Sequence, residues 1–186
     1  DPPAVPLPAG FDYENCSVTF FPIRRCSVHP FGDPDCTEFN TPMVERLTGW
    51  TTGGDRHYKG SMFIGEYYNI SGYKSLPVVF TKLISTDVPW YFRKGARHFH
   101  YMHTPTRLWG TWTLNQYLLA KLLWNVDADA AQVVDGYFRD FYPTTREETR
   151  SFYGHLERAM ANIRTIKYGL RRGLGGRRRG IFRYDH

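Results

Sequence analysis

A carboxylate stands at the end of an apolar segment in the first half of the chain. Met62, Ile64 and Glu66 share one face at the two-residue period of a strand, and tyrosines and a polar loop follow them. Barrel enzymes place catalytic groups at such strand ends. Glu66 is therefore the candidate catalytic acid, with a surface glutamate beside a turn as the alternative.

Aromatic residues make up 17% of the chain, including five tryptophans and thirteen tyrosines. This proportion exceeds what a core alone requires and suits a cleft that stacks flat, partly apolar ligands such as sugars. Several of these rings could equally pack beneath helices. The composition thus indicates a carbohydrate ligand as one interpretation.

A second group of polar side chains follows Glu66 along the chain. His98, His100 and His103 alternate or nearly alternate, and His100 and His103 lie nearest the carboxyl end of their segment. A neutral imidazole at that end could hydrogen-bond sugar hydroxyls or orient the acid, although backbone or water could also satisfy it. We treat His100 and His103 as candidate substrate-binding residues.

The loop after these histidines, residues 104–112, contributes Arg107, Trp109 and Trp112. An indole face can pack against the C–H face of a pyranose, and an arginine favours an acidic sugar or a carbonyl oxygen. The alternative is that the tryptophans anchor the loop to the core. His29, which follows Arg24 and Arg25 after the first predicted strand, is a further candidate, while Arg25 could neutralise an aspartate of the next turn.

Strands and helices in alternation must position these side chains. After a Pro-rich lead-in (1–17), the pattern predicts strands at 18–23, 61–68 and 97–102, and helices at 41–50, capped by Thr41, and 76–94, kinked or broken at Pro89. Three helices between 113 and 168 follow, the second capped by Asp127. Short strand–helix–strand links imply parallel pairing.

Three segments carry a resemblance to a known family. They are residues 21–30 (FPIRRCSVHP), Glu66-Tyr-Tyr68, and residues 114–125 (LNQYLLAKLLWN) with Asp127-Ala-Asp129. Together they resemble the DUF4838 family, which includes the endo-β-N-acetylglucosaminidases of glycoside hydrolase family 163. The similarity spans roughly residues 18–168, and the helix motif is its most specific part.

The resemblance implies an α/β fold in which residues 18–125 form a partial (β/α)8 barrel, about its last four strands, with a helical segment at 126–168. In such a barrel Glu66 would point into the interior and Tyr67 toward the outer helices. Tyr68 or the loop residue Asn69 would contact the saccharide. An unclosed sheet also implies self-association or a separate N-terminal barrel half.

The expected function is the C-terminal portion of a glycoside hydrolase-like domain that acts on a glycan, one that could contain N-acetylhexosamine. Glycoside cleavage needs an acid for the leaving oxygen and a second group at the oxocarbenium-like centre, and Glu66 could supply one of them. A non-catalytic sugar-binding or structural remnant is the alternative. Neither interpretation requires a cofactor.

Cysteine spacing does not favour a metal site. Cys16, Cys26 and Cys36 lie ten residues apart, which matches neither a disulfide framework nor the close pairs of a structural zinc site. Cys26, His29 and Cys36 could form a ligand set, but they supply only three donors at loose spacing. The sequence therefore predicts no metal.

Positive charge is concentrated in an Arg/Gly-rich tail, residues 169–186, which we expect to be flexible. Residues 170–186 hold six arginines and one aspartate, so +5 of the net charge of +6 lies there. This clustering favours a solvated tail over a nucleic-acid site. No run of eighteen apolar residues or charged-then-apolar N-terminus occurs, so we expect neither a membrane span nor a signal peptide.

Overall fold

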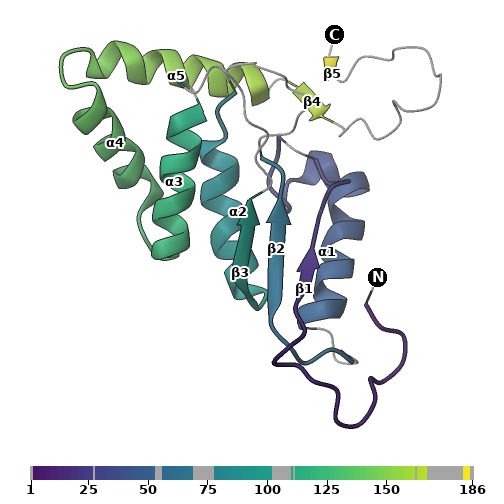
Figure 1. The fold of residues 1–186 in the computed structure, drawn as a ribbon. Coiled ribbons are helices and arrows are strands. Elements are labelled where there is room, and N and C mark those ends of the chain that lie inside the picture. Colours follow the sequence, from purple (N-terminus) through teal and green to yellow (C-terminus); the bar gives the residue numbers. More distant parts are fainter. Residues whose placement is uncertain are drawn as a thin grey trace.

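The computed structural model describes residues 2–26, 28–52, 56–68, 78–101, 110 and 112–161, together with the backbone of two strands beyond them. Figure 1 shows the elements in chain order. They are β1 (Val18–Phe20), the 3-10 helix η1 (Pro34–Cys36), α1 (Thr37–Thr51), β2 (Met62–Glu66), α2 (Thr81–Arg93), β3 (Ala96–Tyr101), α3 (Trp112–Trp124), α4 (Ala130–Phe141), α5 (Arg146–Ala161), β4 (Ile163–Ile166) and β5 (Phe182–Tyr184).

β1, β2 and β3 form a parallel sheet with β2 in the centre. Phe20 lies opposite Ile64, and Glu66 lies opposite Tyr101. The predicted alternation of parallel strands with helices is therefore confirmed. The expected barrel is not seen in the part of the chain that the structure describes, because β1 and β3 have no further partner strand there and the sheet is open.

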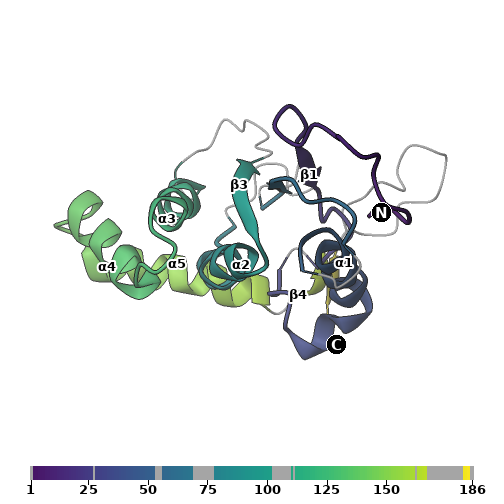
Figure 2. The same cartoon turned by 90° about the horizontal axis from the view of Figure 1, so that it is seen from below.

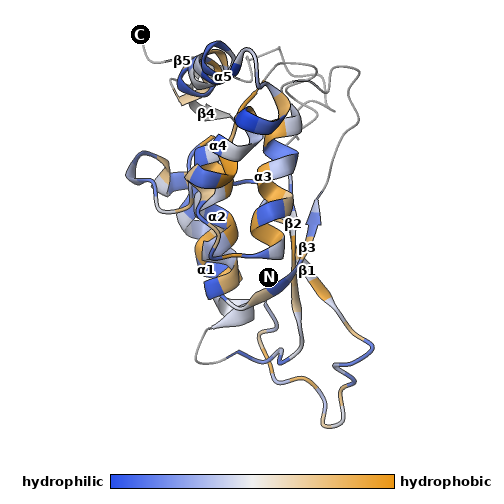
Figure 3. Ribbon diagram, turned by 90° about the vertical axis from the view of Figure 1, so that its left-hand side faces the viewer, coloured by the Kyte–Doolittle hydropathy of each residue, from blue (hydrophilic) through white to orange (hydrophobic). Residues whose placement is uncertain are grey.

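α1 and α2 cover one face of this sheet, and α3 packs beside α2 (Figure 2). The side view in Figure 3 shows the helices on one side of the strands. The helix-covered face buries Met62, Ile64 and Ala96, whereas His98 and His100 on the other face are exposed. Parallel sheets are usually covered on both faces. In the described part of the chain no helix lies on the other face, and this uncovered face is the most unusual feature of the fold.

Three apolar clusters hold the helices in place. One joins the sheet to α1 and α2 through Leu47, Ile64 and Tyr91. A second joins α2 to α3, and a third joins α3, α4 and α5 around Tyr137 and Phe138. Among the described residues, no helix combines the length and apolar character that crossing a membrane would require.

Several element ends differ from those predicted. α1 begins directly after η1, so Thr41 lies inside the helix and does not cap it. α2 begins at Thr81 and continues through Pro89 to Arg93. The proline removes only one backbone donor, and the buried face of α2 is retained on both sides of it.

The C-terminal elements also differ from the prediction. Asp129, rather than Asp127, caps α4 by accepting from the backbone N–H groups of Ala131 and Gln132 at 2.8 and 3.2 Å. α5 ends at Ala161, and β4 and β5 form an antiparallel pair within segments predicted as helix and tail. These ends depend on contacts that the local helical period does not encode.

Candidate functional site

A buried ion cluster joins three distant segments at the carboxyl end of β2. Glu66 is the last residue of β2, Asp87 lies on α2, and Arg25 lies in the loop between β1 and η1. Arg25 Nη1 donates to Glu66 Oε1 at 2.8 Å and also to Asp87 Oδ2. The three side chains are only 3%, 4% and 0% exposed, in the order Arg25, Glu66, Asp87. Arg25 therefore pairs with these two carboxylates and not with the aspartates of the following turn.

Both oxygens of Glu66 have donors. Oε1 also accepts from the hydroxyl of Tyr91, one turn after Asp87 on α2, and Oε2 accepts from the backbone N–H of Tyr67 at 2.9 Å. Asp87 is held in turn by the backbone N–H of Phe31 at 3.4 Å. The carboxylate of Glu66 is thus fully engaged in holding the strand end to α2.

One guanidinium faces two carboxylates in a buried site. Burial raises the pKa of Asp87 to about 6, with Arg25 opposing the rise and Glu66 adding to it. Burial disfavours the charged form of Arg25, yet Asp87 and Glu66 together hold its pKa well above the ordinary value. Burial also raises the pKa of Tyr91 well above its usual value. Asp87 therefore titrates well above the usual range of an aspartate.

The direction of Glu66 is the opposite of the one predicted. The hydrogen bond that it accepts from Tyr91 of α2 places it on the face that α2 covers, whereas Tyr67 contacts Phe21 on the other face. In a barrel the helices lie outside the strands. The alternation of Met62, Ile64 and Glu66 on one face is confirmed, but this is the helix-covered face and not a barrel interior.

Rings line the uncovered face of the sheet. Phe63 stacks on His98 with 4.2 Å between ring centroids. Phe21 meets the ring of His100 edge-on at 6.3 Å, and 38% of Phe21 is exposed. His100, a predicted substrate-binding residue, is therefore exposed to solvent beside an aromatic ring, on the face opposite Glu66.

Gly65 allows this ring arrangement. A Cβ at Gly65 would lie 2.0 Å from Cε1 of Phe21, which no side chain could tolerate without moving the ring. The Phe21 ring therefore lies across the backbone of β2, and it reaches Tyr67 at 5.7 Å between centroids. A glycine in a strand commonly marks such a close approach.

Apart from His29, the other predicted site residues divide into two groups. Tyr68 and Trp112 are 2% and 1% exposed and belong to the core beside Phe80, so neither offers a ring face to a sugar. Among the described residues, the Tyr68 hydroxyl and Trp112 Nε1 have no hydrogen-bond partner. The remaining predicted residues lie outside the described part of the chain; they are Asn69, His103, Arg107 and Trp109.

His29 lies in a second cluster, formed with two thiols. Its Nδ1 is 3.3 Å from Cys26 Sγ and 3.2 Å from Cys36 Sγ. Cys26 and Cys36 are 1% and 0% exposed, while His29 is half-buried. The fold thus brings together three donors whose sequence spacing did not predict a metal site, because η1 turns Cys36 back toward the loop.

The two thiols have different electrostatics. Burial disfavours the thiolate of Cys26, but hydrogen bonds from His29 and the backbone lower its pKa to about 7. Burial and the neighbouring Cys26 raise the pKa of Cys36. The hydrogen bond with Cys26 raises the pKa of His29. A thiolate–imidazole pair beside a neutral thiol is therefore accessible near neutral pH.

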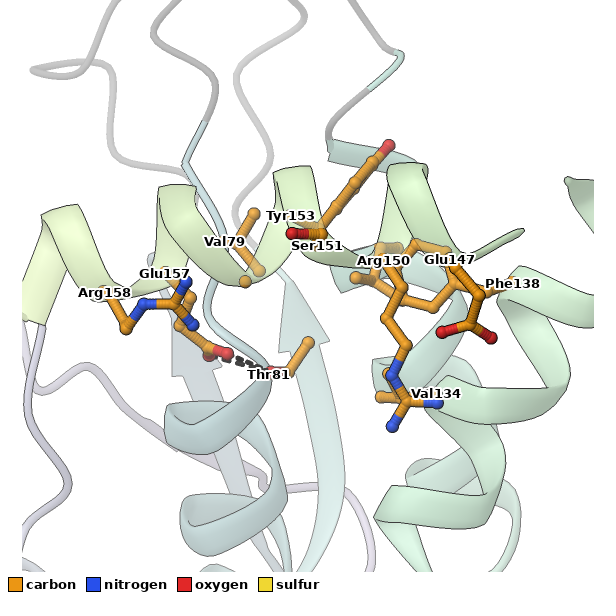
Figure 4. A pocket seen from close by; sticks show the side chains of 12 residues that line it. Val79, Thr81, Val134, Phe138, Glu147, Arg150, Ser151, Tyr153, Glu157 and Arg158 are labelled. Atoms are coloured by element: carbon orange, nitrogen blue, oxygen red, sulfur yellow. Dashed lines mark hydrogen bonds between the residues drawn. The ribbon is translucent and has the colours of Figure 1, made fainter. Parts of the chain in front are cut away.

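A pocket of about 440 Å³ lies where α5 crosses the start of α2 (Figure 4). Glu157 of α5 accepts from Thr81 Oγ1 at 2.7 and 2.8 Å and from the backbone N–H of Lys82 at 2.8 Å, so it caps α2. Arg150 on the pocket wall pairs with Asp135. Glu157 and Arg150 are thus already used in holding helices together.

Neither the scan against protein-family models nor the searches of curated proteins and of solved structures finds a match to this chain.

Proposed function

We propose that this chain contributes the saccharide-binding surface of a glycoside hydrolase-like domain, and that the glycan lies on the uncovered face of the sheet. The observation that carries the proposal is the set of rings on that face. Phe63 and Phe21 present apolar surface, and the exposed imidazoles of His98 and His100 stand beside them. Apolar rings beside hydrogen-bonding groups suit the C–H and hydroxyl faces of a pyranose.

The uncovered face also supports the proposal that these three strands belong to a larger sheet. Parallel sheets are covered on both faces, and their outer strands pair or close into barrels. In the described part of the chain, β1 and β3 are unpaired on their outer sides and the ring-lined face has no helix above it. Further barrel strands packed against this face would satisfy both requirements and leave the saccharide at the carboxyl ends of the strands, where Phe21 and His100 lie.

Glu66 has a positioning role in this proposal. Its Oε1 already accepts from Arg25 and Tyr91, and its Oε2 accepts from the backbone N–H of Tyr67. Only 3% of the residue is exposed. A general acid must reach the leaving oxygen of the substrate. Bond cleavage is accordingly not assigned to Glu66.

Titration with N-acetylhexosamine-containing oligosaccharides, followed by ligand-observed NMR and calorimetry, tests the proposal. His100→Ala and Phe21→Ala should each weaken binding at least tenfold. His155→Ala removes an exposed imidazole from α5 and serves as the matched control, which should bind like the wild type. Equal binding by His100→Ala and His155→Ala, or no binding by the wild type, would contradict the proposal.

Glu66→Gln separates binding from catalysis. We expect this variant to be less stable but to keep the wild-type saccharide affinity at a temperature where both proteins are folded. If the wild type hydrolyses aryl-hexosaminides and Glu66→Gln loses this activity while remaining folded, Glu66 is catalytic and its assignment here is wrong.

A further inference from the structure

Cys26, His29 and Cys36 form one donor set at the start of α1. Their Sγ, Nδ1 and Sγ atoms all lie within 4.8 Å of one another, and among the described residues this is the one such group of three. Both sulfur atoms approach the same imidazole nitrogen, at 3.3 and 3.2 Å. A ring nitrogen has a single lone pair and accepts well from only one S–H donor. The approach of two thiols to the same nitrogen therefore suits an ion bound between the three atoms.

The separations fit a tetrahedral ion. With metal–sulfur bonds of about 2.3 Å and a metal–nitrogen bond of about 2.0 Å, tetrahedral angles place sulfur and nitrogen about 3.5 Å apart. The two observed distances, 3.3 and 3.2 Å, are therefore short of this spacing by about 0.2 to 0.3 Å. Each sulfur is therefore already close to coordination spacing from the imidazole nitrogen, and the three donor atoms lie within 4.8 Å of one another.

Outer hydrogen bonds hold the backbone of the set. The buried side chain of Asn40 accepts from the N–H of Cys26 at 2.9 Å and donates to the carbonyl of Pro30 at 2.9 Å. Arg25 donates to the carbonyls of Cys26 and His29 at 2.9 and 3.0 Å. Such outer contacts orient ligands before a metal arrives. Cys36 is positioned by η1, whose first turn is capped by Asp33.

We propose that Cys26 Sγ, His29 Nδ1 and Cys36 Sγ bind a divalent ion of the Zn²⁺ class, with water in the fourth position. Thiolates and imidazole are the ligands this class of ion prefers, and each thiol releases its proton on binding. His29 is half-buried, so the imidazole is the part of the site that solvent can reach. The ion joins the loop after β1 to the start of α1, next to the buried cluster centred on Arg25.

Metal titration of the reduced, chelator-treated chain tests this site. Co²⁺ should bind one per chain with thiolate-to-metal charge-transfer absorption and the intense visible bands of tetrahedral coordination, and Zn²⁺ should displace it. Zn²⁺ should also raise the melting temperature. Cys36→Ser and His29→Ala should weaken Zn²⁺ binding at least tenfold, whereas Cys16→Ser, which changes the exposed third cysteine, should bind like the wild type.

Three outcomes would overturn the proposal. No metal uptake by the reduced wild type, or equal uptake by His29→Ala and the wild type, would exclude the site. Mass spectrometry showing a Cys26–Cys36 disulfide that persists in the reductant would also exclude it, because no thiolates would be left to coordinate. His29→Ala retains both thiols, so it tests the imidazole even if a cysteine variant fails to fold.

Discussion

Replacing Arg25 by Met is the most direct test of the buried ion cluster. The change keeps an unbranched side chain, although a shorter one, and removes its charge. It leaves Glu66 and Asp87 without a cation, in a site where both carboxylates are at most 4% exposed. It also removes the donors to the carbonyls of Cys26 and His29.

The expected loss of stability depends on whether the two carboxylates stay charged or become protonated. Removing one partner of a buried ion pair costs about 3–5 kcal/mol. The carboxylates can escape by protonation, but at pH 7 this costs about 4 kcal/mol for a carboxyl of ordinary pKa. We therefore expect Arg25→Met to lower the free energy of unfolding by about 4 kcal/mol, a large part of the ~5–15 kcal/mol that holds a typical domain together.

The effect must depend on pH. In Arg25→Met the folded carboxyls have pKa values above those of the unfolded chain, so the folded state binds more protons and gains stability as pH falls. The deficit relative to the wild type should shrink by about 1.4 kcal/mol per pH unit for each proton that the variant's carboxyls take up beyond those that the wild type binds. Urea unfolding followed by circular dichroism at pH 7 and pH 5 measures both quantities.

Arg139→Met is the matched control. Arg139 pairs with Asp140 through its guanidinium at 2.7 Å, but both side chains are half exposed or more. Water replaces the lost partner, so the unfolding free energy should hardly change at either pH. A loss for Arg25→Met as small as that for Arg139→Met, or a deficit that is the same at pH 5 and pH 7, would refute the reasoning.

Three further predictions concern single side chains. The pKa of Asp87, raised to about 6, makes the folded state bind more protons than the unfolded state. As the pH rises from about 4 to about 6, the unfolding free energy of the wild type should therefore fall by on the order of 3 kcal/mol more than that of Asp87→Asn. Urea titrations at each pH measure this difference. Asp129→Ala removes the cap of α4 and should cost about 1 kcal/mol in thermal unfolding, whereas Asp127→Ala should cost less. Gly65→Ala should displace the Phe21 ring and change the NMR shifts of His100, an effect that should vanish in a Phe21→Ala background.

The strands and their parallel order could be predicted because apolar runs and short links encode them locally. The orientation of Glu66 could not. A two-residue period shows that Met62, Ile64 and Glu66 share a face, but the side on which the helices pack depends on contacts between elements. The expectation of a barrel therefore led to the wrong side for this carboxylate.

The buried ion pairs of Arg25 could not be predicted from the sequence either, for a different reason. Arg25 reaches Glu66 across 41 residues and Asp87 across 62, and no spacing rule spans such distances. One local feature was available: Asp87 is a charged residue within the apolar face of α2, between Ile84 and Val88. A buried charge of this kind requires a partner of opposite sign.

Glu157 caps α2 from a helix that lies about 75 residues further along the chain. During synthesis, the first turn of α2 leaves the ribosome long before its cap exists. The amide groups at that end must rely on water until α5 has been made, so the start of α2 matures only after α5. A piece that stops before α5 would keep the strands and lose this closing contact.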